Sequence, residues 1–142
     1  MMNYLKLLLL CVCLSSCAGT DKPLAGPQYQ EHVFVVNIAA GEEKLNAYLD
    51  YHKKIWPEVE AGFKKAGYRQ ISLYRFDHLV VMRILVDKGA DLDQLGKLAE
   101  SYSPKCKAWN NLMGEFQVGV TGTAPGQKWV ETELFYEYPN RP

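Results

Sequence analysis

Cysteine is scarce in the part of the chain that is long enough to fold. The 142 residues include four cysteines, of which three lie within the first 17 positions and the fourth is Cys106. One thiol cannot form a disulfide within a chain, so the fold must depend on its hydrophobic core. No Cys–His pairing motif accompanies Cys106, and we interpret it as a half-buried structural cysteine rather than a nucleophile.

An excess of charge of either sign is also absent. Sixteen Lys and Arg residues balance sixteen Asp and Glu residues. Without a basic stripe, the sequence offers no electrostatic support for a nucleic-acid partner or a phosphorylated substrate. A neutral ligand suits a chain with this balance.

The common motifs of cofactor and metal chemistry are missing as well. The sequence has no Gly-rich phosphate loop, no Cys-x-x-Cys pair and no serine in a nucleophile elbow. Asp50 and His52 are two residues apart, and such side chains point to different faces of a helix, so they form a poor metal pair. We therefore expect neither a metal nor a cofactor.

The N-terminus carries an export signal. Lys6 precedes an eight-residue apolar run from Leu7 to Leu14, which is far shorter than the roughly 20 residues that span a bilayer. The run ends in Leu14-Ser15-Ser16-Cys17, which resembles the lipobox of bacterial lipoproteins. We expect residues 1–16 to be a signal peptide. An ordinary secretory signal, with Cys17 as a free thiol, is the alternative.

This resemblance implies that Cys17 receives the lipid and becomes the mature N-terminus. Residues 17–30 then form a tether, because residues 18–30 contain two Gly and two Pro and show no apolar period. The domain is expected in the cell envelope, outside the cytoplasm, held to a membrane through its lipid anchor alone.

Residues 31–142 have the size of one ordinary domain. A β-branched and aromatic run over residues 32–38 predicts a buried strand. Gly41-Glu42-Glu43 opens a helix, and Pro57 should bend or restart it, because proline cannot donate the helical hydrogen bond. The second segment is expected to end before Gly67 in the left-handed conformation.

The remainder of the domain also contains both predicted strands and predicted helices. The predicted elements are strands at 69–76 and 79–86 around an Asp77-His78 turn, helices at 91–100 and 104–113, a loop at 119–127 and a last strand at 128–138. The order β-α-β-β-α-β predicts an α+β, ferredoxin-like antiparallel sheet with helices on one face. Its bare face favours a homodimer, the dimeric α/β barrel.

His52 is the most promising of the three histidines for chemistry. It lies on the apolar stripe of the first helix, one turn after Tyr48 and one turn before Trp56, so the three side chains project from one face. An imidazole beside a phenol and an indole can form a pocket with polar tips and an apolar wall. The alternative is a core histidine satisfied by Tyr48 or by the Lys53 carbonyl. Three more aromatic residues could line such a site or simply belong to the core: Tyr74, Trp109 and Trp129.

The pattern Tyr48-x-x-x-His52-x-x-x-Trp56-Pro57-Glu58 resembles the L-rhamnose mutarotase family, and the resemblance runs from Phe34 to about Tyr138. It implies a ferredoxin-like dimer that binds a small neutral monosaccharide. It also implies that His52 is the general acid and that Tyr48 contacts the sugar, with Trp56 beside them.

The resemblance extends to four more site residues, with two departures. Trp109 matches the first of two tryptophans that contact the sugar in that family, and Asn110 stands at the position of the second. Ile71 replaces a substrate-contacting tyrosine, and Tyr74 aligns with another aromatic residue of the same strand. The choice of sugar is therefore expected to differ.

The function implied is mutarotation, the interconversion of α and β anomers, with L-rhamnose or a related 6-deoxy or other aldose as substrate. Two alternatives remain open. One is a sugar-binding lipoprotein without turnover. The other is a different enzyme on the same dimeric scaffold, such as a small monooxygenase.

Overall fold

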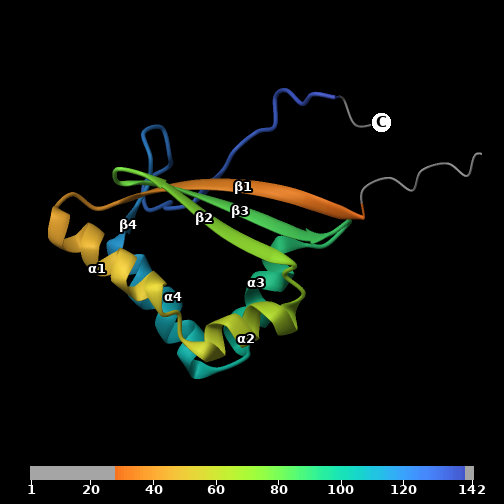
Figure 1. The fold of residues 1–142 in the computed structure, drawn as a ribbon, viewed down its shortest axis with the longest axis horizontal. Helices are drawn as coiled ribbons and strands as arrows, with labels where there is room; N and C mark the ends of the chain where they lie inside the picture. The colour runs from red at the N-terminus through yellow and green to blue at the C-terminus, as the bar shows by residue number, and fades with distance from the viewer. Residues whose placement is uncertain (1–27, 140–142) are drawn as a thin grey trace, which may run out of the picture.

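The structure, a computed structural model, describes residues 28–139. In this part of the chain, five strands form one antiparallel sheet, and all the helices pack on one of its faces (Figure 1). In chain order the elements are β1 (Tyr29–Ile38), α1 (Glu42–Lys53), α2 (Pro57–Ala66), β2 (Gln70–Phe76), β3 (Leu79–Asp87), α3 (Leu92–Ser101), α4 (Pro104–Phe116), β4 (Gln117–Val118) and β5 (Val130–Glu131). The predicted signal peptide and Cys17 lie outside the described residues.

The sheet confirms the predicted α+β, ferredoxin-like arrangement. Its strand order is β2-β3-β1-β4, with β5 paired to the same edge of β1 as β4. β1 and β3 pair from Tyr29–Asp87 to Asn37–Leu79. Tyr29 and Gln30, which the sequence placed in the tether, are already part of β1. None of the helices within residues 28–139 has the length and apolar character needed to cross a bilayer.

Local signals place the helix and turn boundaries where the sequence predicted them. α1 ends at Lys53, and Pro57 restarts the chain as α2. Gly67 then ends α2 with φ of 108°, a left-handed conformation that glycine adopts without steric cost. Asp77 makes the hairpin turn between β2 and β3 with φ of 51°, which a short polar side chain tolerates.

The predicted last strand is wrong over most of its length. Only Val130 and Glu131 form β5, opposite Val35 and Phe34. Thr132 still bonds the Val33 carbonyl, but residues 133–139 are not part of a strand. The alternation of side chains is typical of a strand, yet a strand forms only where a neighbour offers hydrogen bonds. The predicted helix end at Met113 is also early, because α4 continues to Phe116 and leads directly into β4.

The two faces of the sheet differ in how they are covered. The face beneath the helices carries the buried residues Val36, Ile38, Val80, Ile84 and Val86. On the other face, a row across four strands consists of Tyr74, Val81, Val35 and Val130, and no described element covers it. We call this uncovered side the outer sheet face.

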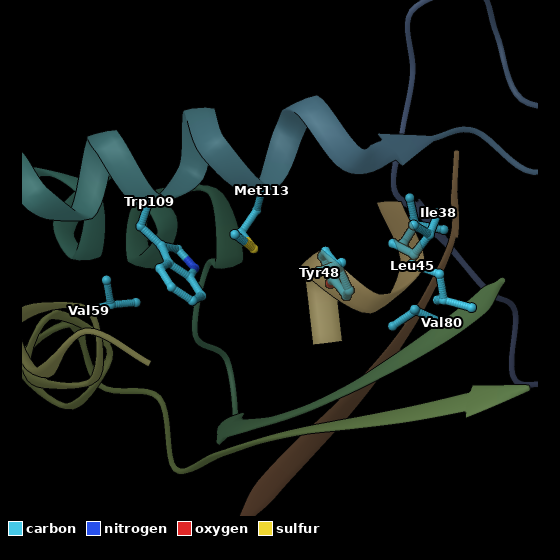
Figure 2. Packing of buried hydrophobic residues seen from close by; sticks show 8 residues of the cluster. Ile38, Leu45, Tyr48, Val59, Val80, Trp109 and Met113 are labelled. Atoms are coloured by element: carbon cyan, nitrogen blue, oxygen red, sulfur yellow. The ribbon is translucent and has the colours of Figure 1, made fainter. Parts of the chain in front are cut away.

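The core lies between the sheet and the helices. Figure 2 shows Ile38, Leu45 and Val80 gathered at one end, with Tyr48 beside them and Met113 and Trp109 following along α4. This packing holds α1 and α4 against the sheet at one end and leaves room between the helices and the strands further along.

Candidate active site

A cavity of about 810 Å³ lies between the helices and the covered face of the sheet. Its wall is mostly apolar, with Ile55, Phe63, Ile71, Leu73, Met82, Ile84, Trp109 and Met113 among the lining residues. Polar and charged side chains also line it, among them Glu60, Lys64, Arg69 and Gln70, and α1 contributes Tyr48 and His52. An apolar hollow with a small number of placed polar groups is the usual form of a small-molecule site.

His52 lies in the wall of this cavity and is half-buried. Its ring stands between two aromatic rings, with centroids 4.3 Å from Tyr48 and 5.4 Å from Trp109. Nδ1 lies 2.9 Å from the backbone oxygen of Tyr48. Because a carbonyl only accepts hydrogen bonds, Nδ1 carries the proton and Nε2 of the neutral ring carries a lone pair. No described residue hydrogen-bonds Nε2, so this nitrogen is available to a ligand.

Burial lowers the pKa of His52 below its ordinary value of 6.5, and the hydrogen bond to the Tyr48 carbonyl opposes this shift without overcoming it. The imidazole is therefore neutral at neutral pH and can accept a proton at Nε2. The sequence left two interpretations of His52 open, a residue of a small pocket and a core histidine bonded to the helix, and this arrangement has features of both. One nitrogen is satisfied by the helix, and the other has no hydrogen-bond partner among the described residues.

Tyr48 is almost completely buried, with 2% of its surface exposed. Burial raises the pKa of its phenol, and a hydrogen bond with the Gln117 side chain opposes this, as a donor to the phenol oxygen does. Gln117 in turn accepts a hydrogen bond from Trp129 Nε1, at 3.2 Å. Gln117 therefore accepts from Trp129 and lies beside the phenol of Tyr48.

Trp109 presents an indole to the cavity from α4 and is only 5% exposed. Figure 2 shows it projecting from α4 towards the sheet. Trp56 packs edge-on against it, with ring centroids 5.4 Å apart, and does not line the cavity itself. The structure therefore places Trp56 behind Trp109, where it supports that ring.

Ile71 and Asn110 both line the cavity, but Tyr74 does not. Side chains alternate along β2, so Ile71 and Leu73 face the helices while Tyr74 projects from the outer sheet face with 57% of its surface exposed. Within a single chain, Tyr74 therefore lies outside this cavity.

Gln117 is a functional candidate that the sequence did not reveal. It follows α4 and belongs to the two-residue strand β4, whose pairing with Ile38 brings it beside α1. No sequence pattern predicts a strand of only two residues. Trp129, by contrast, was one of the aromatic residues noted for a possible site.

The described residues contain no group of three or more His, Cys, Asp and Glu side chains that could hold a metal. Cys106 is buried and donates to the Glu58 carbonyl, away from the cavity wall. The side chains described above can transfer protons and form hydrogen bonds with a ligand in the cavity.

Comparison with known proteins agrees with this geometry. The family model of L-rhamnose mutarotase matches residues 31–138. The chain belongs to the L-rhamnose mutarotase family. An L-fucose mutarotase of Xanthomonas campestris pv. campestris is 32% identical to it over 105 residues, which cover 72% of this chain and 82% of that protein.

Solved structures show where else this mutarotase-family fold occurs. An L-rhamnose mutarotase from Formosa agariphila superposes with a TM-score of 0.50 at 19% identity, over 76% of this chain and 98% of that one. The tetracenomycin F2 cyclase of Streptomyces glaucescens, a type-II polyketide cyclase, gives a TM-score of 0.50 at 18% identity, over 78% and 98% of the two chains. At these identities the likeness concerns the fold alone.

Proposed function

We propose that this protein interconverts the α and β anomers of a small neutral aldose, L-rhamnose or a related 6-deoxy or other sugar, with His52 as the acid–base group. The observation that carries the proposal is the orientation of His52. Its Nδ1 is held by the helix, its Nε2 has no hydrogen-bond partner among the described residues, and the residue lines the cavity together with Tyr48 and Trp109.

The chemistry needs only the transfer of a proton. Neutral His52 takes the proton of the O1 hydroxyl at Nε2, and the imidazolium so formed gives that proton to the ring oxygen O5 as the C1–O5 bond breaks and the C1=O1 double bond forms. Rotation about C1–C2 in the open-chain aldehyde and reclosure give the other anomer. Positioned proton transfer of this kind contributes about 10²- to 10⁴-fold in rate.

The other side chains bind and orient the sugar. Tyr48 lines the cavity with a phenol, which can hydrogen-bond a sugar hydroxyl. Trp109 offers an apolar face, on which the C–H face of a pyranose can stack. The mostly apolar wall favours a ligand without net charge.

The test is saturation-transfer NMR between the anomers of a panel that includes L-rhamnose and L-fucose. We expect at least one sugar to exchange faster with the protein present, and His52→Gln to slow that exchange by about 100-fold or more. His78→Gln, in the β2–β3 turn, is the matched control. Binding of a sugar with no added exchange would identify a sugar-binding protein instead and contradict the proposal.

We further propose that two copies of the chain pair through the outer sheet face. Tyr74 and Phe76 leave 57% and 82% of their surfaces exposed there. In the last residues of the chain Leu134, Phe135, Tyr136 and Tyr138 are between 69% and 93% exposed. So many large apolar side chains in water favour association with a second, identical surface.

Attachment to the envelope is the final part of the proposal. The apolar run and the Leu14-Ser15-Ser16-Cys17 sequence support a lipid on Cys17. Growth of an expressing bacterium with a labelled fatty acid tests it. The label should enter the wild-type protein and should be lost in Cys17→Ser. Labelling of both proteins, or of neither, would reject the anchor.

A further inference from the structure

A second hollow adjoins the cavity on the helical side of the molecule. It has a volume of about 480 Å³, lies between α3 and α4, and shares two lining residues with the cavity, Gly96 and Asn110. We call it the outer hollow. At Gly96 no side chain stands in the wall, and a β-carbon built there would meet nothing nearer than the Tyr68 hydroxyl, at 3.9 Å. The two spaces therefore adjoin at Gly96 and Asn110, and Gly96 contributes no side chain to the boundary.

The outer hollow differs from the cavity in its chemistry. Its polar lining consists of Asp93, Lys97, Glu100, Ser101, Lys107 and Asn110. Two carboxylates and two ammonium groups balance, so the hollow has no electrostatic preference for an anion or a cation. Together these side chains offer both donors and acceptors of hydrogen bonds. A neutral ligand with several hydroxyl groups satisfies such a surface.

Asn110 is held in place at the boundary between the two spaces. Its Nδ2 donates to Glu100 Oε2, 2.9 Å away. This bond orients the amide and leaves its Oδ1 and the other Glu100 oxygen as acceptors for ligand hydroxyls. A ligand that extends from the cavity past Asn110 meets fixed polar groups rather than a closed wall.

The size of the cavity also favours a ligand larger than one sugar ring. A volume of about 810 Å³ is near the upper end of the roughly 300–1,000 Å³ that enclose drug-sized ligands, which have more atoms than one pyranose ring. A single sugar at His52 leaves space unfilled towards α3 and α4.

We propose that the outer hollow is a subsite for a second sugar ring, so that the substrate is the free reducing end of a neutral disaccharide or longer saccharide. This inference rests on the proposed mutarotase function. The reducing ring lies at His52, where its C1–O5 bond opens and closes with transfer of one proton from O1 to O5. The next ring, linked through the far edge of the reducing ring at O3 or O4, passes Asn110 and lies between α3 and α4. Its glycosidic bond does not change.

The experiment compares anomer exchange of L-rhamnose and L-fucose with that of each sugar carrying a glucosyl group on O3 or O4. We expect kcat/KM for at least one disaccharide to exceed that of its parent monosaccharide by about tenfold. In the double variant Lys97→Ala, Lys107→Ala the ratio of disaccharide to monosaccharide exchange should fall at least threefold, and Ser101→Trp, which fills the hollow, should lower it further. The charge-matched control Lys44→Ala, Lys88→Ala should keep the wild-type ratio, because neither lysine lines either space.

The outcomes separate this inference from the function on which it rests. If the monosaccharides exchange and no disaccharide exchanges faster, the subsite is rejected and mutarotation stands. A ratio that is the same in the hollow variants and in the control also rejects the subsite. If neither class of sugar exchanges, both proposals are wrong.

Discussion

His52 donates a hydrogen bond through Nδ1 to the backbone oxygen of Tyr48, one helical turn before it, at 2.9 Å. This bond fixes the tautomer of the imidazole, and the tautomer decides which nitrogen can react. The same helical spacing places the Tyr48 ring against the His52 ring. One turn of α1 therefore supplies both the reactive group and its orientation.

The first prediction concerns pH. Because burial lowers the pKa of His52 below 6.5, kcat/KM for anomer exchange should be level above that value and fall at lower pH, with an apparent pKa below 6.5. Between the lowered pKa and the ordinary one, the unfolded chain binds more protons than the folded chain. Stability should therefore fall as pH decreases through this window.

Exchange rates and urea unfolding measured between pH 4 and pH 8 check both parts. His52→Gln should remove this component of the stability change, whereas His78→Gln should keep it. An activity profile that declines only above pH 7 would contradict the neutral form of His52 as the reactive species.

Gln117→Leu should weaken binding of the sugar. The substitution removes the side-chain amide that bonds Tyr48 and accepts from Trp129 Nε1, and a buried polar group left unpaired costs about 1–3 kcal/mol. We expect KM to rise about three- to tenfold with a smaller change in kcat, and the pKa of Tyr48 to rise further, as measured by ultraviolet absorbance of the phenolate. Gln94→Leu, on the exposed face of α3, is the control. Equal effects of the two substitutions would show that Gln117 does not position Tyr48.

Two helical glycines should respond in opposite directions to alanine. A β-carbon at Gly62 would lie 2.9 Å from the backbone oxygen of Ala99 and 3.2 Å from the sulfur of Cys106. Because a backbone atom cannot easily move, Gly62→Ala should lower the free energy of unfolding by about 1–3 kcal/mol. Gly96→Ala has open space, because the nearest atom to the new β-carbon is the Tyr68 hydroxyl, 3.9 Å away, and the substitution should raise the free energy of unfolding by about 0.5–1 kcal/mol. Urea denaturation of the two variants tests the close packing of α2 against α3 and α4, and stabilisation by both substitutions would contradict it.

The proposed dimer interface on the outer sheet face can be tested by substituting two residues of equal exposure. Tyr74 and Leu98 are each 57% exposed, but Tyr74 projects from the sheet and Leu98 from α3 in the helical layer. Tyr74→Glu should place a charge in the proposed interface and yield monomers in sedimentation velocity, while Leu98→Glu should remain a dimer. A wild-type protein that sediments as a monomer at all concentrations, or dissociation caused by Leu98→Glu instead, would reject this interface.

How far the sequence predicts the molecule depends on the range of the forces involved. The restart at Pro57, the left-handed Gly67 and the Asp77-His78 turn follow from the conformations of single residues, and the structure confirms all three. The spacing of Tyr48 and His52 likewise follows from the helix period. These features need no knowledge of the rest of the chain.

Contacts between segments that are distant in the sequence could not be predicted from such local patterns. The alternation over residues 128–138 indicates a strand, but its length depends on the edge of β1 that β4 also uses, where Val130 and Glu131 form β5 and Thr132 adds one more backbone bond. Tyr74 shares the apolar character of Ile71, and only the sheet register decides that the two face opposite sides. Gln117 meets Tyr48 because β4 pairs with β1, far away in the sequence.

By itself, then, the sequence determined the α+β order, most helix boundaries and the histidine with its aromatic neighbours and its bond to the preceding turn, because these depend on local geometry and periodicity. Tertiary structure alone decided which strand residues line the cavity, that Tyr74 lies outside it, and that Gly96 and Asn110 line both the cavity and the outer hollow. These depend on packing between elements, which no local pattern encodes.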